Sequence, residues 1–190
     1  MKPLFLDVET TGLPPKGSNW REHWKYFPHI VSISWIFNRE HDYIIKPEGY
    51  EIPPEATAIH GITNDQAKGG HDLGIILRKF CDDAMRASVI VGHNIHFDTS
   101  IVQANTLRLN TTILMMEIGV ALEKNRRLCT MLSSTKFCGR THDNGRPRWP
   151  TLEYLYAKLF NETFEGVHSS MADVKATKRC YKELIKLKVI

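Results

Sequence analysis

Two acidic side chains stand where a strand would otherwise be apolar. The stretch FLDVETTGLP (5–14) sets Asp7 and Glu9 two positions apart. Since residues i and i+2 of a strand share a face, the two carboxylates project side by side. Buried carboxylates stay ionised only when they are paired or bound to a cation, and Mg²⁺ and Mn²⁺ prefer oxygen ligands. The pair is compatible with a metal site, although two acids that merely end a strand at solvent are the simpler explanation of the pair alone.

Two later stretches supply more groups of the same kind. In VIVGHNIHFDTSIV (89–102) an apolar strand runs into a Gly-His-Asn turn, and Asp98 falls in the first turn of a helix. In VHSSMADVKAT (167–177) His168 precedes Asp173 by five residues, with the histidine in a loop and the aspartate in a helix. Imidazole titrates near neutral pH and suits proton transfer. A loop histidine is usually a surface residue and an aspartate at a helix start is favoured by the helix dipole, so only the combination indicates a site.

The elements that must position these groups alternate along the chain. Residues 2–9, 29–38, 42–47 and 88–92 predict strands, and the connection 10–28 predicts a long loop or a short helix within a loop. Thr63 is a plausible helix N-cap. We expect a mixed sheet covered by helices on both faces, with the ligand near strand ends and helix starts. The predicted helices are 72–87, 97–109, 113–124, 129–137, 151–160 and 171–187.

Composition is that of an ordinary folded domain. The 190 residues are 42% hydrophobic and 24% charged, with no apolar run long enough to cross a bilayer. We expect one domain and, without a signal peptide, a cytoplasmic location away from membranes. The four cysteines are widely spaced and are expected to be reduced. The positive charge is local. Basic residues gather in DVKATKRCYKELIKLKVI (173–190) and in TKFCGRTHDNGRPRWP (135–150), which are either a solvated helix face and a polar loop or contacts for a polyanion.

The three stretches together carry a family resemblance. The order DxETTG, HNxxFD and HxxxxD resembles the DEDDh-type 3′-to-5′ exonucleases, the superfamily of the bacterial polymerase III proofreading subunit, RNase T and oligoribonuclease. The resemblance covers the chain from Phe5 to about Thr177. It implies a ribonuclease H-like α/β fold, with a mixed five-stranded sheet flanked by helices on both faces, and a single exonuclease domain over residues 1–190.

The resemblance also implies a role for individual residues. Two divalent metal ions, Mg²⁺ or Mn²⁺, would be bound by the four carboxylates, and the histidine would be the general base. For Gly12, Leu13 and Phe97 a structural role as a turn or core residue is an open alternative. The implied metal ligands are Asp7, Glu9, Asp98 and Asp173, the implied base is His168, and the implied substrate-binding residues are Thr10, Thr11, Gly12, Leu13, His60, Gly61, Asn94 and Phe97.

The implied activity is release of nucleoside 5′-monophosphates from single-stranded 3′ ends. DNA is favoured over RNA because His60-Gly61-Ile62 is more similar to the polymerase-associated members. An exoribonuclease of the same family and a non-catalytic nucleic-acid-binding module are the alternatives, and a polymerase or repair protein is a possible partner. Histidine and cysteine spacings complete no tetrahedral zinc set, and the glycines form no nucleotide-binding loop.

Two features depart from the family pattern. Residues 14–27 form a longer and more aromatic connection than usual, in which Trp20 and Trp24 suggest either a flap that stacks on bases or a docking patch for a partner. Ser170 stands in the third motif where alanine is common, a small change.

Overall fold

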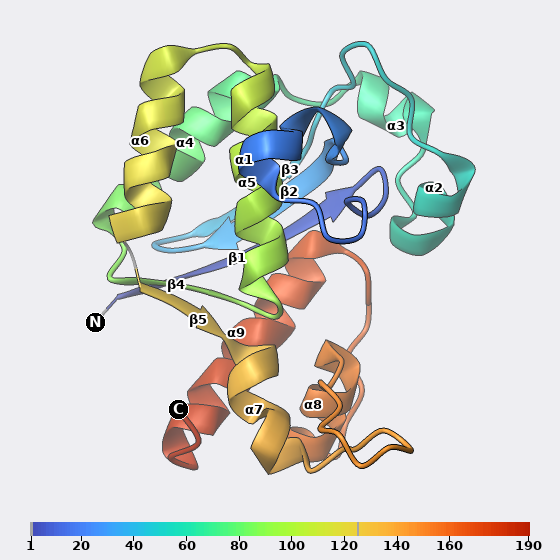
Figure 1. Cartoon of the computed structure of the whole chain (residues 1–190), viewed down its shortest axis with the longest axis vertical. Coiled ribbons are helices and arrows are strands. Elements are labelled where there is room, and N and C mark those ends of the chain that lie inside the picture. The colour runs from blue at the N-terminus through green and yellow to red at the C-terminus, as the bar shows by residue number, and fades with distance from the viewer. Residues whose placement is uncertain (1, 125) are drawn as a thin grey trace.

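A five-stranded sheet forms the centre of the computed structural model, which describes residues 2–124 and 126–190. The strand order is β3-β2-β1-β4-β5; β1 pairs antiparallel with β2 and parallel with β4, so the sheet is mixed as predicted (Figure 1). The strands are β1 (Pro3–Thr10), β2 (Ile30–Ile36), β3 (Glu40–Ile44), β4 (Val89–Gly92) and β5 (Arg126–Cys129).

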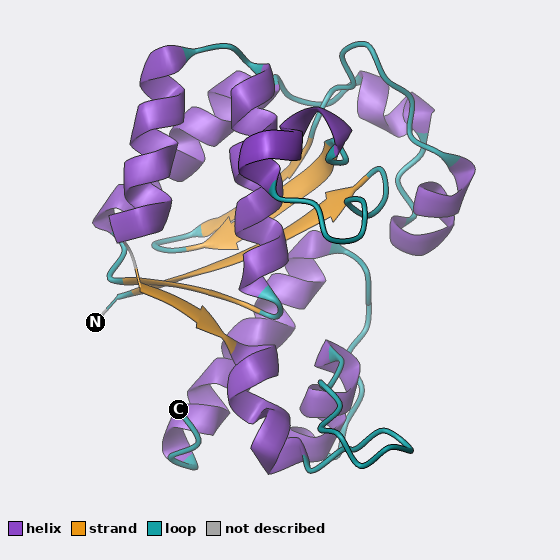
Figure 2. Cartoon of the chain, in the orientation of Figure 1, coloured by secondary structure: helices purple, strands orange, loops and turns teal. Residues whose placement is uncertain are grey.

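Helices cover both faces of the sheet, which confirms the predicted layers (Figure 2). On one face Trp35 and Ile33 of β2 join the main hydrophobic cluster with Phe80 and Ile101 from the helices. On the other face, Phe5 packs with residues of the last helix. The helices are α1 (Trp20–His23), a 3₁₀ turn η1 (Trp24–Tyr26), α2 (Pro54–His60), α3 (Asn64–Lys68), α4 (Leu73–Arg86), α5 (Ile95–Arg108), α6 (Thr112–Lys124), α7 (Thr130–Cys138), α8 (Leu152–Phe160) and α9 (Ser170–Lys186).

The sequence located most elements but missed two. Strand β5 is four residues long and begins with two arginines, so it lacks an apolar run, and only its parallel pairing with β4 defines it. Helix α2 follows Pro53 and carries Pro54 at its first position, where proline is compatible with a helix because that N–H has no intrahelical partner. The short helix in the 14–27 segment and the Thr63 N-cap are confirmed.

Two further expectations concern the whole chain. All four cysteines are free, as predicted. No helix in the described part of the chain is both long and apolar enough to span a bilayer.

Candidate active site

Strand β1 presents Asp7 and Glu9 on one face of the sheet. Its residues alternate, so Leu6 and Val8 point into the main core while the two carboxylates point toward α9. Across the ladder, Asp7 lies opposite Ser34 and Glu9 lies opposite Ser32. The register shifts after Glu9, which ends the regular strand where the acidic residues stand.

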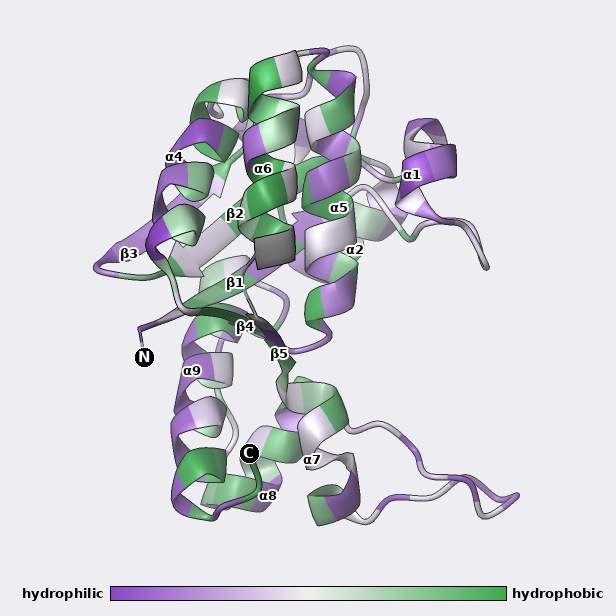
Figure 3. Ribbon diagram, turned by 60° about the vertical axis from the view of Figure 1, so that its left-hand side comes forward, coloured by the Kyte–Doolittle hydropathy of each residue, from purple (hydrophilic) through white to green (hydrophobic). Residues whose placement is uncertain are grey.

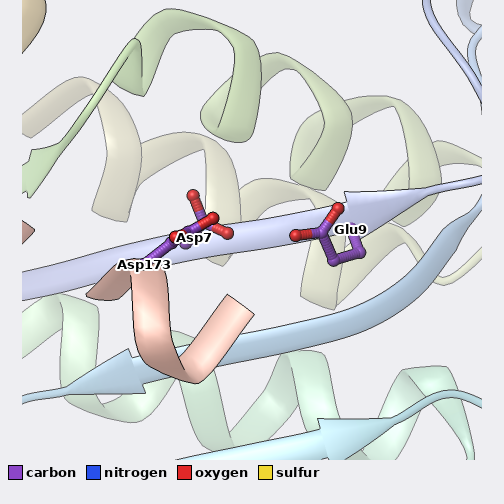
Figure 4. Close-up of side chains that lie close together, drawn as sticks. All are labelled: Asp7, Glu9 and Asp173. Atoms are coloured by element: carbon purple, nitrogen blue, oxygen red, sulfur yellow. The ribbon is translucent and has the colours of Figure 1, made fainter. Parts of the chain in front are cut away.

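Helix α9 brings a third carboxylate to this pair. One ligand oxygen from each of Asp7, Glu9 and Asp173 lies within 4.8 Å of the other two (Figure 4). Asp173 lies in the first turn of α9, which crosses the face of β1 and β2. Its Oδ1 atom is buried and accepts no hydrogen bond from the described residues. Three acids distant in the sequence therefore converge on one point of the sheet.

Asp98 approaches the same region at the edge of β1 that faces away from β2. Strand β4 ends at Gly92, so the edge of β1 beyond that point has no strand partner. The N–H of Val8 donates instead to Asp98 Oδ1 at 3.2 Å. Asp98 is only 2% exposed, and its charge contributes to the raised pKa of Asp7. The first turn of α5 thus places a fourth carboxylate beside the cluster.

The four carboxyl groups disfavour one another's ionised form. Burial, then the charges of Asp98, Asp173 and Glu9, raise the pKa of Asp7 well above its usual value. Burial and the charge of Asp173 raise the pKa of Glu9 to about 8. Burial likewise raises the pKa of Asp98, and that of Asp173 to about 6, while His168 acts on Asp173 in the opposite direction.

A divalent cation fits this donor set. Among the described residues, no lysine or arginine forms an ion pair with any of the four carboxylates. Buried carboxylates without a counter-charge are unfavourable in the ionised form, and hard oxygen donors suit Mg²⁺ or Mn²⁺. The buried Oδ1 atom of Asp173, which accepts no hydrogen bond from the described residues, has a lone pair available for a cation.

His168 lies in the turn that precedes α9. Its side chain is exposed, and its backbone has φ of 65°, in the left-handed region that costs a non-glycine residue roughly 1–3 kcal/mol. The imidazole is close enough to Asp173 to lower the pKa of that carboxyl group. The loop-then-helix placement of His168 and Asp173 is therefore as predicted.

Strand β1 ends at the buried Thr10, and the chain then leaves the sheet toward solvent. Thr10 donates its hydroxyl to the carbonyl of Gly12 at 2.6 Å, and Thr11 pairs with the backbone of His29. Gly12 has φ of 153°, which L side chains rarely adopt, so this turn requires glycine. Leu13 is 83% exposed. Its alternative role as a core residue is therefore wrong.

The other predicted substrate residues fall in two places. Asn94 and Phe97 line a hollow of about 490 Å³ between the 14–21 segment and the start of α5. Asn94 adopts φ of 74°, which asparagine tolerates better than most residues, and Phe97 packs partly against the core. His60 and Gly61 end α2, and no hydrogen bond of the described residues links them to the acidic cluster.

Comparison with known proteins places this site in a family. The model of the RNase T exonuclease family matches residues 4–181. The chain belongs to the RNase T exonuclease family. The resemblance carried by the three acidic motifs is thereby confirmed.

Relatives of this exonuclease-family chain include two polymerase proteins and one solved exonuclease. PolC-type DNA polymerase III of Streptococcus suis is 31% identical over 125 residues, 66% of this chain and 8% of that protein. DNA polymerase III subunit epsilon of Haemophilus influenzae is 25% identical over 115 residues, 59% of this chain and 44% of that one. The fold matches E. coli exonuclease I in complex with a dT13 oligonucleotide with a TM-score of 0.72, at 22% identity, over 97% of this chain and 41% of that chain. The chain thus spans less than half the length of each.

In this exonuclease-family chain, hydrogen bonds between serine hydroxyls hold the start of α9, which carries the third motif, against β2. The sequence analysis did not predict this network. Ser170, 3% exposed at the start of α9, lies 3.0 Å from Ser32 Oγ and 2.7 Å from Ser34 Oγ. Ser34 donates to Asp42 Oδ1 at 2.7 Å, so Ser170 must donate to Ser34 and accept from Ser32, because each hydroxyl has one proton. The network ties the helix that carries Asp173 to the strand opposite Asp7 and Glu9. Serines at alternate positions of a buried strand were its sequence signal.

The second half of the 14–27 segment forms a wall that is hydrogen-bonded to α5. The Arg108 guanidinium donates to the carbonyls of Trp24, Lys25, Phe27 and Pro28. Trp20 and Trp24 are partly buried against the main core, and Trp20 lines the 490 Å³ hollow.

Proposed function

We propose that the chain is a divalent-metal-dependent exonuclease that hydrolyses phosphodiester bonds at the 3′ ends of single-stranded DNA and releases nucleoside 5′-monophosphates. The observation that carries this proposal is the convergence of Asp7, Glu9 and Asp173 within 4.8 Å, with Asp98 beside them and no basic partner among the described residues. The chain's membership of an exonuclease family supports the reaction class.

The chemistry divides between the acidic cluster and His168. Asp7, Glu9, Asp98 and Asp173 would hold two Mg²⁺ or Mn²⁺ ions, which would neutralise the charge of the phosphate and make water a stronger acid. The imidazole of His168, exposed beside Asp173, takes the proton of the attacking water. Since His168 is held in a turn directly before α9, its position depends on the start of that helix.

The substrate end lies over the turn that follows β1. Leu13, exposed on the Gly12 turn, contacts the last base, while Thr10 and Thr11 stabilise the turn. Phe97 and Asn94 offer a partly exposed ring and a polar edge beside Asp98. A leucine and a ring accept every base, because stacking and apolar contact are tolerant of sequence. His60 and Gly61 complete this side of the substrate site.

DNA is the substrate that the relatives favour. The exonuclease I structure that this chain resembles holds a dT13 oligonucleotide, and two relatives are DNA polymerase III proteins. The same relatives support a polymerase as a partner. An exoribonuclease is the second candidate, because no described side chain marks a 2′-hydroxyl contact. A binding module without catalysis would not require five groups suited to hydrolysis.

Digestion of a 5′-labelled single-stranded oligonucleotide tests the proposal. With Mg²⁺ or Mn²⁺ we expect stepwise shortening from the 3′ end and nucleoside 5′-monophosphates as products; EDTA stops both. Asp173→Asn removes activity, whereas Asp82→Asn, the same change at an exposed position of α4, keeps it. Shortening that persists in EDTA, or in Asp173→Asn, would refute the mechanism. A matched RNA oligomer, degraded more slowly, confirms the DNA preference; faster RNA degradation favours the exoribonuclease.

A further inference from the structure

We propose that a small hairpin between α7 and α8, residues 140–148, binds the phosphate backbone of the single-stranded substrate away from the end that is cut. We call it the arginine hairpin. It extends from the body of the molecule (the orange loop at lower right in Figure 1), and its residues are mostly hydrophilic (Figure 3). The proposal rests on the proposed nuclease function and assigns a second contact to the same substrate.

The backbone of the hairpin places its basic side chains on one face. Thr141 and Pro147 form an antiparallel bridge, Arg148 N–H donates to the Arg140 carbonyl at 2.9 Å, and His142 N–H donates to the Arg146 carbonyl at 2.8 Å. Directly opposite residues of an antiparallel pair share a face, as do residues two positions apart on one strand. The basic face is therefore made of Arg140, His142, Arg146 and Arg148.

The hairpin holds one acidic residue, Asp143, which lines the same hollow as Arg146 and Arg148, and no ion pair balances the basic face within the described part of the chain. None of its three arginines forms an ion pair there, and Arg140 and Arg148 lie directly across from each other, where like charges destabilise a strand pair. Every residue from 141 to 149 is exposed. Arg146 and Arg148 line a hollow of about 510 Å³ on the hairpin. Repulsion between these arginines destabilises the hairpin when nothing is bound. Contacts with the phosphates of a polyanion would offset that repulsion, so the basic face suits such a ligand.

The base of the hairpin is anchored to the second acidic motif. His93, directly before Asn94, donates from Nε2 to the Pro150 carbonyl at 3.0 Å, and its Nδ1 lies 3.1 Å from the hydroxyl of Thr130, which donates to the Gly92 carbonyl. Burial lowers the pKa of His93, which favours the neutral imidazole. A strand held by the hairpin therefore leads toward the turn that precedes Asp98.

Two further side chains complete the surface. The Arg140 guanidinium lies 4.4 Å from the ring centroid of Tyr154 on α8, which fixes the root of the hairpin. Trp149 is 61% exposed directly after the basic face and offers a ring on which a base can stack. Arg146 and Arg148 remain as the two arginines that are free to contact phosphates.

Binding measured in EDTA tests the hairpin without requiring hydrolysis. Fluorescence anisotropy of a labelled 24-nucleotide single strand gives the association constant at several salt concentrations. For Arg146→Gln/Arg148→Gln we expect affinity weaker by on the order of tenfold, and a slope of log K against log salt that is shallower by about 1.4, because each lost phosphate contact removes about 0.7. Arg146→Lys/Arg148→Lys, which keeps both charges, retains the wild-type slope.

Arg39→Gln/Lys79→Gln is the matched control. It removes two positive charges near β3 and α4, on the side of the molecule away from the hairpin (Figure 3), and leaves slope and affinity unchanged. A thermal melt verifies that each variant is folded. Equal salt slopes in the hairpin variant and the wild type would overturn the proposal, as would an equal loss in the lysine variant.

Hydrolysis of a two-nucleotide fragment separates this proposal from the proposed function. Such a fragment is too short to reach a second site, so Arg146→Gln/Arg148→Gln cleaves it at the wild-type rate. A wild-type protein that binds the long strand through the hairpin but cleaves neither substrate leaves the hairpin standing and refutes the exonuclease.

Discussion

Two clusters of like charge occur in this molecule, and they differ in their exposure to water. Four carboxyl groups converge beside β1 in a buried setting that raises their pKa values. Three arginines gather on an exposed hairpin between α7 and α8. Water screens the exposed charges, so the hairpin folds without a ligand; burial leaves the acids only protonation or a compact cation. Repulsion between like charges thus predicts a bound metal ion at the acidic cluster and an extended polyanion at the arginine hairpin.

Removal of one charge from the buried cluster should have the largest effect. We expect Asp7→Asn to lower exonuclease activity by more than about 100-fold. This loss exceeds the one expected when a residue only supports a metal ligand, which reaches about 100-fold at most. The same change raises the stability of the metal-free protein at pH 8, because it removes a repelling group. Steady-state rates and thermal melts measure the two effects. Activity retained in Asp7→Asn would contradict the assignment.

The acidic cluster also makes stability depend on pH and metal. Folding raises the pKa of Glu9 from 4.5 to about 8, so the folded state holds more protons than the unfolded state between these values. The metal-free protein therefore loses stability as pH rises through this window. Mn²⁺ at 100 times its dissociation constant adds about 2.7 kcal/mol, or roughly 5 to 10 °C in melting temperature, for a chain of this length.

Thermal melts at pH 5 and pH 8, with EDTA or Mn²⁺, measure this linkage. The Mn²⁺ shift should be larger at pH 8 than at pH 5, because fewer protons compete with the metal for the carboxylates. Arg146→Gln/Arg148→Gln is the control, because its lost charges are exposed, and its Mn²⁺ shift should equal that of the wild type at both pH values. Equal Mn²⁺ shifts at both pH values would contradict the linkage.

The wall formed by residues 24–28 offers a contrast to the hairpin. Arg108→Met deletes the guanidinium bonds to four carbonyls, and a hydrogen bond to a charged group contributes about 1.5–3 kcal/mol. We expect faster amide exchange in this segment and little change in the hairpin. Lys79→Met, an exposed change on α4, is the control. Unchanged exchange in residues 24–28 would show that packing of Trp20 and Trp24 holds the wall.

The smallest predicted effect concerns the serine network. Ser170→Ala leaves Ser32 and Ser34 with fewer partners and lowers the free energy of unfolding by about 1 kcal/mol. The double variant Ser34→Ala/Ser170→Ala should cost less than the sum of the single changes, because the two hydroxyls share a bond. Denaturant unfolding of the wild type, the two single variants and the double variant gives the free energies for this double-mutant cycle. Strict additivity would show that the network is not coupled.

Sequence patterns predicted those parts of the fold that local chemistry determines. Strand β1, with carboxylates at alternate positions, and α9, with its loop histidine, are defined by spacing over a few residues. Asp98 was placed in the first turn of α5 because a buried strand and an asparagine turn precede it. That the acids meet was inferred from family resemblance rather than from spacing.

The remaining features depend on contacts between distant residues. Strand β5 exists because β4 pairs with it, and the Ser170 network exists because α9 crosses β2. The arginine hairpin could be recognised only as a basic stretch, since the face shared by its arginines follows from the pairing of Thr141 with Pro147. No single-residue propensity encodes such pairings.

Calorimetric titration of the metal-free protein with Mn²⁺ tests the central claim most directly. At pH 7 we predict saturable binding that releases protons, seen as a heat that depends on the buffer, because Glu9 with a pKa of about 8 is protonated before the metal binds. Asp7→Asn should lose this binding, and Asp82→Asn should keep it. Absence of saturable Mn²⁺ binding to the wild type, or equal binding to Asp7→Asn, would contradict the account.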